Sequence, residues 1–401
     1  MPEADFPGRE PGHAAEVTKM GQIAAEAGLR RINMLAWRDF DDPEAGGSEV
    51  HAEEIARLWA EAGLEVTIRT SFAPGHPRTS WRNGHRVIRK GGRYMVFPRA
   101  AISEMMQWHG PRDAVVEIWN GMPFFSPLWA RCPYVIFHHH VHGEMWEMTL
   151  PPRLARLGRF FEERLAPVLY HDARVITVSE FSQRELVEDL GFNPRRVSVV
   201  HNGLDARFTP SRDRSPVPLV LAVGRLVPVK RFDRLIDALA QVRLRFPELR
   251  AVIVGDGYKR EELEAQARQL GAEQWLSLPG RISDADLVAL YQQAWIVASA
   301  SAREGWGLSI SEAAACGTPA VATRAPGHVD SVRENESGLL IDTNDEMVAA
   351  LTMLIESPAE RERLGRGGLA VASSLSWEAT ARQALEVLAE EAIRHQRRPD
   401  R

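Results

Sequence analysis

Two glutamates stand eight positions apart in the stretch AREGWGLSISEAAACGTPAVAT, residues 302–323. Glu304 lies beside Gly305 and close to Gly307, and Glu312 follows in an alanine-rich run. Two neighbouring carboxylates can work as a catalytic pair of the kind that cleaves glycosides. They can also be ordinary acids on a helix or loop surface, or they can accept hydrogen bonds from the hydroxyl groups of a ligand. The surrounding elements distinguish these three interpretations.

A strand-to-helix turn carries the first glutamate. WIVASA before it has the pattern of a buried strand, and LSISEAAACG after it begins a helix, so Gly305 and Gly307 fall in the turn. Glycines allow a ligand to approach the backbone, and the N–H groups of a helix N-terminus favour an anion. Because a carboxylate repels a phosphate, we predict that Glu304 and Glu312 bind hydroxyls on either side of such an anion. A nucleotide sugar has hydroxyls on its ribose and on its sugar.

Two further turns carry residues that suit a phosphate group. In AVGRLVPVKRFD, Arg225 follows a strand and Lys230 comes five residues later. A guanidinium fork and an ammonium charge together suit a diphosphate, although two solvated surface charges would have the same pattern. In FDDPEAGGSEVHAEEIA, Gly46 and Gly47 precede a helix and could present backbone N–H groups, but glycine pairs are common in turns.

A run of histidines follows the apolar segment YVIF. His138, His139, His140 and His142 are interrupted only by a valine. A zinc site is one interpretation, but consecutive residues of an extended chain alternate faces and rarely converge on one ion. A histidine that faces a ligand is the other. We therefore predict no metal site.

Several familiar binding motifs are absent or incomplete. The sequence has no P-loop, no HExxH and no CxxC. VGDGYKREEL has Gly255 and Gly257 of a dinucleotide fingerprint, but Arg260 occupies the third glycine position, so an NAD site is not expected. The aspartates of DFDD, residues 39–42, precede a proline, and we interpret them as part of a loop rather than as metal ligands.

Composition bounds the class of protein. The 401 residues, 44% hydrophobic and 26% charged, fit a globular protein of two domains, and the net charge of -5 does not suggest nucleic acid as a partner. No apolar run is long enough to span a bilayer, and the N-terminus lacks the apolar core of a signal peptide. The two cysteines, Cys132 and Cys316, lie in apolar surroundings and fit a reducing cytoplasm.

Short apolar runs alternate with helical patterns along the whole chain, which predicts parallel sheets covered on both faces. The proline-rich stretch LDARFTPSRDRSPVP interrupts the alternation and suggests an interdomain linker. We therefore predict an α/β fold with two doubly wound, Rossmann-like domains that face each other across a cleft. The expected boundaries are a mobile tail or loosely docked helix over 1–30, an acceptor domain over 31–205, a linker over 206–217, a donor domain over 218–372, and a C-terminal helix over 373–401 that crosses back to the first domain.

Taken together, VVHNGLD, VGRLVPVKRFD, VGDG, PGRISDADLVALYQQAW and EGWGLSISEAAACGTPAVAT resemble the retaining glycosyltransferases of family 4, which have the GT-B fold. The resemblance covers nearly all of the chain after Ile32. It implies that Arg225 and Lys230 hold the donor diphosphate, that Glu304 contacts the donor sugar, and that His139, or else His142, reaches the sugar from the first domain. It also implies donor-binding roles for Gly47, Gly255, Gly280, Arg281, Ile282, Gly305, Gly307, Leu308 and Glu312.

The resemblance further implies the reaction. A sugar would pass, with retention of anomeric configuration and without a metal or a cofactor, from a nucleotide diphosphate sugar, UDP- or GDP-linked, to a hydroxyl acceptor such as a sugar, a polyol, a lipid-linked glycan or a natural product. A sugar-nucleotide epimerase and a non-catalytic nucleotide-sugar-binding protein are the alternatives. The expected location is the cytoplasm. The segment PPRLARLGRFFEERLAPVLY, with Arg153, Arg156 and Arg159 between apolar residues, is either a core-packed helix or a contact with the inner face of the membrane.

Overall fold

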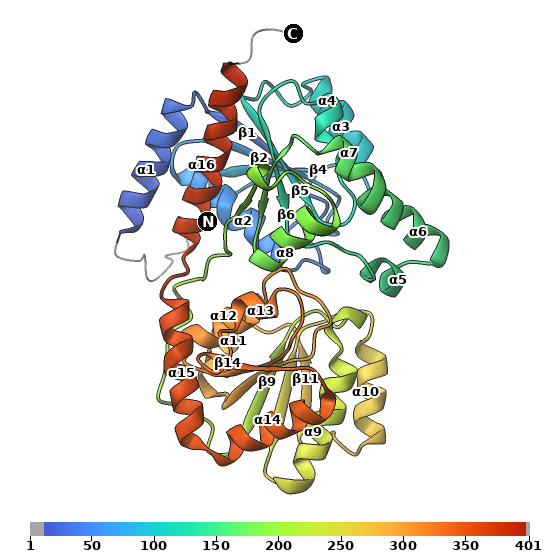
Figure 1. Cartoon of the computed structure of the whole chain (residues 1–401), viewed down its shortest axis with the longest axis vertical. Coiled ribbons are helices and arrows are strands. Elements are labelled where there is room, and N and C mark those ends of the chain that lie inside the picture. Colours follow the sequence, from blue (N-terminus) through green and yellow to red (C-terminus); the bar gives the residue numbers. More distant parts are fainter. Residues whose placement is uncertain (1–11, 398–401) are drawn as a thin grey trace. The chain divides into compact units, whose positions relative to one another are not determined.

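The structure is a computed structural model that describes residues 12–397, and within this range the chain forms two compact units (Figure 1). The N-terminal unit comprises residues 12–203 together with 377–397, and the C-terminal unit is Leu204–Ser376. The chain thus leaves the first unit once and returns to it through its last helix. No helix in the described range is both long enough and apolar enough to cross a membrane.

The N-terminal unit is built on an eight-stranded sheet with the order β3-β4-β2-β1-β5-β6-β7-β8. All neighbours are parallel except β3 and β4, which form an antiparallel pair at one edge. The central strand β5, with the sequence AVVEIW, is buried at every position, as expected for a parallel strand covered on both faces. The strands are β1 (Arg31–Leu35), β2 (Glu65–Thr70), β3 (Thr79–Arg82), β4 (His85–Arg89), β5 (Ala114–Trp119), β6 (Tyr134–His138), β7 (Arg174–Thr177) and β8 (Val197–Val199).

Helices cover this sheet, and the last helix of the chain is among them. α16 (Trp377–Gln396) packs against α1, α2, β6 and β7 of the N-terminal unit. The other helices are α1 (His13–Glu26), α2 (Gly47–Glu61), α3 (Val96–Met105), α4 (Ser126–Trp129), α5 (Met145–Thr149), α6 (Pro152–Phe160), α7 (Ala166–Leu169) and α8 (Glu180–Arg184), with π-helical turns at Phe161–Leu165 and Glu185–Asp189 and a 3₁₀ turn at Pro194–Arg196.

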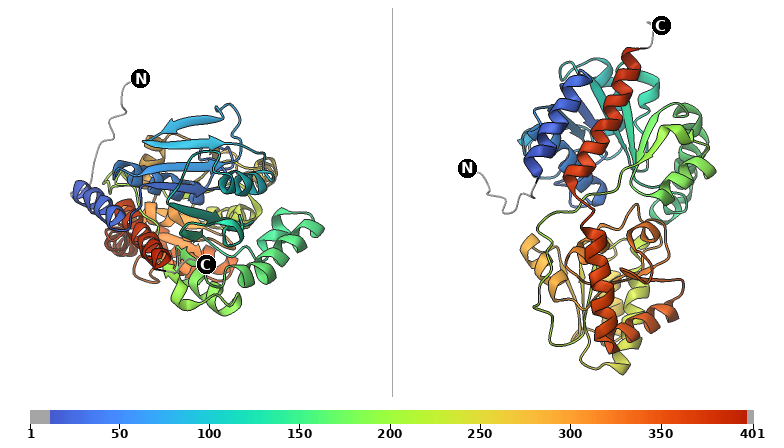
Figure 2. Two further views of the ribbon diagram at one scale, coloured as in Figure 1. Left: turned by 90° about the horizontal axis from the view of Figure 1, so that it is seen from above. Right: turned by 60° about the vertical axis from the view of Figure 1, so that its left-hand side comes forward.

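For residues 1–30 we predicted a mobile tail or a loosely docked helix, and in the described part the chain forms a helix, α1, that lies side by side with α16 (Figure 2). Met20 and Ala24 of α1 are buried, and the helix packs against both α16 and α2. His13 contacts Glu61 of α2 at 3.0 Å and Glu378 of α16 at 2.8 Å. Local sequence could not reveal this packing, because the partner helix begins more than 350 residues later. Residues 1–11 of the predicted tail lie outside the described range.

The C-terminal unit has a six-stranded, wholly parallel sheet with the order β11-β10-β9-β12-β13-β14. Two Rossmann-like α/β units confirm the predicted fold class. The strands are β9 (Leu219–Val223), β10 (Arg250–Val254), β11 (Leu276–Gly280), β12 (Ile296–Ser299), β13 (Ala320–Thr323) and β14 (Gly338–Ile341). The helices are α9 (Phe232–Arg245), α10 (Arg260–Gln269), α11 (Asp284–Gln293), α12 (Leu308–Ala315), α13 (His328–Ser331), α14 (Asn344–Glu356) and α15 (Pro358–Ala372), with a 3₁₀ turn at Pro228–Lys230.

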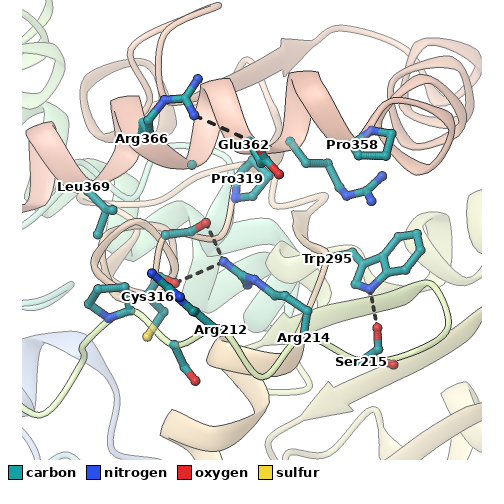
Figure 3. A pocket seen from close by; sticks show the side chains of 15 residues that line it. Arg212, Arg214, Ser215, Trp295, Cys316, Pro319, Pro358, Glu362, Arg366 and Leu369 are labelled. Atoms are coloured by element: carbon teal, nitrogen blue, oxygen red, sulfur yellow. Dashed lines mark hydrogen bonds and ion pairs between the residues drawn. The ribbon is translucent and has the colours of Figure 1, made fainter.

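Residues 206–217, which we predicted to be a linker, contain no helix or strand and belong to the C-terminal unit. Arg214 holds this segment in place by donating hydrogen bonds to the carbonyl oxygens of Ala294 and Gly317, each at 2.7 Å. Arg214 also lines a cavity of about 780 Å³ beside α15 (Figure 3). The cavity lies at the amino ends of β12 and β13, because Trp295 and Pro319, which line it, immediately precede those strands.

Candidate active site

The sequence-predicted donor residues lie at the opposite edge of the C-terminal sheet. All six strands are parallel, so their carboxyl ends share one edge, which is where ligands of such folds bind. The turns after β9, β10, β11 and β12, together with the start of α12, bring the predicted residues to this edge: Arg225, Lys230, Gly255, Gly280, Arg281, Ile282, Glu304, Gly305, Gly307, Leu308 and Glu312.

Glycines at this edge allow adjacent turns to touch. A Cβ on Gly255, whose φ is +137°, would lie 1.9 Å from the carbonyl oxygen of Gly224. The N–H of Gly255 donates to the carbonyl oxygen of Gly280 at 2.9 Å, which ties the turns after β10 and β11 together. Close contact between backbones therefore explains why residue 255 is a glycine, and its predicted contact with the donor stays a prediction. Gly257 is similar, because its Cβ would lie 2.4 Å from the carbonyl oxygen of Leu226.

Lys230 and Glu304 form an ion pair at this edge. The Lys230 ammonium donates to Glu304 Oε1 at 2.5 Å, and the Ser301 hydroxyl donates to the same oxygen at 2.7 Å. Burial by itself would raise the pKa of Glu304, but the charges of Lys230 and His328 and these hydrogen bonds outweigh it and lower the pKa. Glu304 is therefore ionised at neutral pH. In the sequence, Arg225 comes after β9 and before Lys230, and its side chain is partly exposed.

His328 is a residue of this cluster that sequence reasoning missed. It is almost completely buried, and its ring nitrogens lie 3.1 Å from the Ser299 hydroxyl and 2.9 Å from the carbonyl oxygen of Thr323. Burial lowers the pKa of His328, against the opposing effect of Glu304. The available signal was the motif PGHVD, which follows β13 at the same carboxyl edge as the other site residues.

The start of α12 lies at the same edge of the sheet. Gly307 precedes the helix in the left-handed region, with φ +101°, and no side chain caps the helix. The positive φ favours glycine at this position, and a Cβ would make a tight contact of 3.1 Å with Ser331 Oγ. Leu308 is the first helical residue, and Gly305 lies in the turn before it. The first N–H groups of a helix without a cap favour an anion.

Glu312 lies farther along α12 in a different environment. The Tyr291 hydroxyl donates to Glu312 Oε2 at 2.6 Å. Burial raises the pKa of Glu312, against the opposing effects of this hydrogen bond and of Arg207. Ile282 packs against the same apolar cluster as Tyr291, and Arg281 beside it is exposed. The two glutamates of the opening stretch thus differ: Lys230 compensates Glu304, whereas a neutral phenol contacts Glu312.

Gly47 of the N-terminal unit is the first residue of α2, and Gly46 before it is in an extended conformation. Glu49 accepts a hydrogen bond from the Gly46 N–H at 2.8 Å and another from the Ser48 hydroxyl at 3.0 Å. Ser48 in turn accepts from the Asn120 side chain at 2.8 Å. This glycine turn therefore has a defined conformation at the start of a fifteen-residue helix.

The histidines after β6 separate into different environments. His138 packs edge-on against Trp119 in the core, and burial lowers its pKa to about 3. His139 is 5% exposed, its Nε2 lies 3.2 Å from His51 Nδ1, and burial lowers its pKa to about 4. His142 stacks on His140. His138 thus belongs to the core. The neutral imidazole of His139 has one nitrogen that can donate a hydrogen bond to a hydroxyl group and one that can accept a hydrogen bond from it.

Glu162 was also missed, and it organises the loop that bears His142. This buried carboxylate accepts hydrogen bonds from the backbone N–H groups of His142 at 2.7 Å and Gly143 at 3.0 Å, and from the Trp146 indole at 3.0 Å. Burial raises the pKa of Glu162, against the effect of these donors. The sequence gives no local sign of this contact, because Glu162 lies 20 residues after His142 and looks like a helix-surface acid.

The acids of DFDD have arginine partners. Asp39 contacts Arg82 at 2.9 Å and Arg89 at 3.1 Å, and Asp41 contacts both arginines. Asp39 and Asp41 lie in a loop, as expected. Within residues 12–397, no group of three or more His, Cys, Asp or Glu side chains has an arrangement that could hold a metal ion.

Each of the two units matches the model of a known protein family. Residues 207–371 match the family described as Glycosyl transferases group 1, and residues 45–208 match Glycosyltransferase Family 4. A D-inositol 3-phosphate glycosyltransferase of Nocardioides sp. is 34% identical over 90% of this chain and 89% of that protein. One from Thermobifida fusca is 36% identical over 91% of this chain and 92% of that protein. The chain belongs to glycosyltransferase family 4. This confirms the family inferred from the motifs.

Solved structures agree on the fold of this family 4 glycosyltransferase. Sucrose-phosphate synthase from Thermosynechococcus elongatus matches with a TM-score of 0.76 and 21% identity, over 88% of this chain and 97% of that one. An Anabaena protein solved in complex with UDP and glucose matches with a TM-score of 0.71 and 21% identity, over 90% of this chain and all of that one. At these identities the likeness concerns the fold. Both are consistent with the GT-B class predicted from the sequence.

Proposed function

We propose that this family 4 glycosyltransferase transfers a sugar from a nucleotide diphosphate sugar to a hydroxyl acceptor, with retention of configuration and without a metal ion. The observation that supports this most directly is the grouping of Lys230, the ionised Glu304 and the uncapped start of α12 at one sheet edge. A cation and helix N–H groups suit the diphosphate, and an ionised carboxylate suits sugar hydroxyls.

The proposed mechanism stabilises the leaving group. As the bond between the sugar and the diphosphate breaks, negative charge develops on the diphosphate oxygen. Lys230, Arg225 and the N–H groups at the start of α12 stabilise that charge. The acceptor hydroxyl attacks from the face that the diphosphate leaves, and its proton passes to the departing phosphate oxygen. This path retains configuration and needs no side-chain nucleophile.

Other residues bind and orient the donor in this proposal. Glu304 accepts hydrogen bonds from the sugar, and Glu312 accepts them from the ribose, whose structure does not change during the reaction. Arg281 and Ile282 line the pocket for the nucleotide base. In the N-terminal unit, the turn at Gly47 approaches the phosphates. His139 binds the sugar through its neutral ring, with His142 as the second candidate for that role.

The relatives suggest which substrates to try first. Their name, D-inositol 3-phosphate glycosyltransferase, contains a phosphorylated polyol. Structural neighbours were solved with UDP and with UDP-glucose. We therefore propose UDP-sugars as the first donors and polyols, including polyol phosphates, as the first acceptors, with GDP-sugars and lipid-linked or natural-product acceptors next.

Incubation with a panel of UDP- and GDP-sugars, with and without polyol acceptors, tests the proposal. Acceptor-dependent release of the nucleoside diphosphate, with formation of an α-linked product from an α-linked donor, is expected. Isomerised donor without an acceptor would instead identify an epimerase. Tight donor binding without turnover across a broad acceptor panel would identify a nucleotide-sugar-binding protein. A product with inverted anomeric configuration would refute retention but not the sugar transfer itself.

A further inference from the structure

The outward face of α3 in the N-terminal unit is apolar. Ile102, Met105 and Met106 are 50%, 58% and 62% exposed, and Trp108 just beyond the helix is 58% exposed. Tyr94 and Met95, immediately before the helix, are exposed to a similar degree. Met95, Ile102 and Met106 follow helical spacing and therefore lie on one face. We call these six residues the α3 surface.

The inward face of α3 is partly polar, and its contacts fix the helix in this orientation. Glu104 is 1% exposed and accepts a hydrogen bond from the Asn33 side chain at 2.9 Å. It also pairs with Arg112 at 3.0 Å. Ser103 is buried and accepts a hydrogen bond from Arg69. Rotation of the helix to bury its methionines would expose these contacts, so α3 keeps an apolar face toward solvent and its polar groups inside. Apolar patches of this kind on a soluble protein usually mark an interaction site.

The segment around the α3 surface is strongly basic. Residues 71–111 contain seven Lys and Arg and a single acid, Glu104, which is buried. Arg82 and Arg89 pair with Asp39 and Asp41, and Arg93 pairs with Glu44. Four of the basic residues have no ion pair within residues 12–397: Arg78, Arg86, Lys90 and Arg99.

Several of these cations lie close enough together to repel one another. Burial and the charges of Arg69, Arg99, Arg78 and Arg86 lower the pKa of Lys90. Burial and the charges of Arg69, Lys90, Arg86 and Arg99 likewise lower the pKa of His109, which follows α3, to about 4. Arg69 is buried, and its Nε has no hydrogen-bond partner within the described residues. An anion beside this group would relieve the repulsion.

We propose that the α3 surface docks on an anionic lipid bilayer. Trp108, Met105 and Met106 enter the boundary between head groups and acyl chains, where Trp and exposed apolar side chains are favoured. Arg86, Lys90 and Arg99 face the lipid phosphates. A second copy of this chain is a poorer partner, because a symmetric contact through this face would bring two positively charged segments together.

The helix α6, which sequence analysis singled out for membrane contact, also exposes Leu154, Leu157 and Phe160. Of its three arginines, Arg159 pairs with Glu147 at 3.0 Å and with Glu163 at 2.9 Å, which leaves Arg153 and Arg156 without an ion pair within residues 12–397. Two basic residues of α6 therefore have no ion pair within the described residues, against four in the segment around α3. The proposal therefore assigns the membrane contact to α3 and uses α6 as the matched comparison.

Co-sedimentation of the full chain with vesicles tests the assignment. The vesicles are pure phosphatidylcholine, or phosphatidylcholine and phosphatidylglycerol in equal parts. A charge variant carries Arg86→Gln, Lys90→Gln and Arg99→Gln. An apolar variant carries Met105→Ser, Met106→Ser and Trp108→Ser. The control carries Leu154→Ser, Leu157→Ser and Phe160→Ser in α6. Circular dichroism and the midpoint of thermal unfolding verify that each variant is folded.

The expected result is binding of the wild type to anionic vesicles only, at low ionic strength, with loss at high salt. The charge variant should partition about 100-fold more weakly, because each basic side chain near an anionic surface contributes about fivefold. The apolar variant should also lose binding, and the α6 control should keep it.

Three results would overturn the proposal: a wild type that ignores anionic vesicles, an α6 control that alone loses binding, or a concentration-dependent dimer that the α3 variants abolish in the absence of vesicle binding. The sedimentation assay requires no turnover, so its outcome does not depend on the proposed transferase activity. That activity is measured separately, as release of the nucleotide in the absence of vesicles.

Discussion

Replacing Lys230 with methionine should leave a carboxylate without its counter-charge. The Lys230 ammonium lies 2.5 Å from Glu304 Oε1, and the two side chains are 18% and 16% exposed. Removal of one partner from a buried pair costs about 3–5 kcal/mol, and the residual solvent contact places this pair at about 2–3 kcal/mol. That corresponds to a decrease in Tm of about 5–10 °C for a unit of this size. The double variant Lys230→Met, Glu304→Gln removes both charges and should be within about 1 kcal/mol of the wild type.

The pH dependence of this loss has a definite sign. In the wild type the pKa of Glu304 is lowered, so its ion pair stabilises the fold above the unfolded-state pKa, and this stability is lost as pH falls through the folded-state pKa. In Lys230→Met, burial is no longer opposed by the ammonium, and the pKa of Glu304 should rise. Protonation then relieves the buried charge. The difference in unfolding free energy between wild type and Lys230→Met should therefore be larger at about pH 8 than at about pH 5.

Urea unfolding of the full chain at several pH values measures this difference, and donor-saturation kinetics on the same proteins separates stability from catalysis. The double variant should recover stability but not turnover, because it still lacks the Lys230 ammonium that we propose to stabilise the diphosphate. By analogy with the loss of one oxyanion donor, kcat should fall about 10²- to 10³-fold in both variants. A stability difference that does not change with pH, or wild-type turnover in either variant, would refute the assigned role of the pair.

Three further predictions follow from the same geometry. Glu312→Gln should mainly raise the donor KM, because a ribose contact is equal in ground and transition states, whereas Glu304→Gln should mainly lower kcat; saturation kinetics showing the reverse would exchange the two roles. Gly255→Ala should destabilise the chain by several kcal/mol, about 3 or more in urea unfolding, because its Cβ would lie 1.9 Å from the carbonyl oxygen of Gly224; an unchanged unfolding midpoint would contradict the contact. Turnover should be the same with and without EDTA, since Lys230, Arg225 and helix N–H groups are proposed to act on the diphosphate; activity that vanishes in EDTA and returns with magnesium or manganese would overturn metal independence.

The fold was predictable because its signals are local. Each strand of the C-terminal unit is a short apolar run, and each is followed by a turn rich in glycine or charge, as in LVLAVGR and WIVASA. In a parallel sheet the carboxyl ends of all strands share an edge, so the position of a residue after a strand was enough to place Lys230, Glu304 and Gly307 together. Glycine alone is harder to interpret: the contact with Gly224 explains why residue 255 is a glycine, and the donor contact of Gly255 stays a prediction.

The contacts that were missed join residues far apart in the chain. α1 looked like a tail because its buried face meets α16, which begins at Trp377. Nothing near Glu162 in the sequence indicated its burial, because its three donors lie 16–20 residues earlier, in the loop after β6 and in α5. On α3 the apolar face was not recognised as exposed, because a sequence pattern shows that a helix has two faces without showing which of them meets the sheet.

The two glutamates of the opening stretch illustrate what tertiary structure adds to a motif. Their spacing suits an acid/base pair, and their pKa values do shift in opposite directions, which is the usual sign of such a pair. The causes of the shifts indicate otherwise. Glu304 is ionised because Lys230 and Ser301 already contact it, so it is a weak proton acceptor suited to hydroxyl binding. Glu312 lies within α12, where it contacts the neutral phenol of Tyr291 beside an apolar cluster, and we propose that it binds the donor rather than transfers a proton.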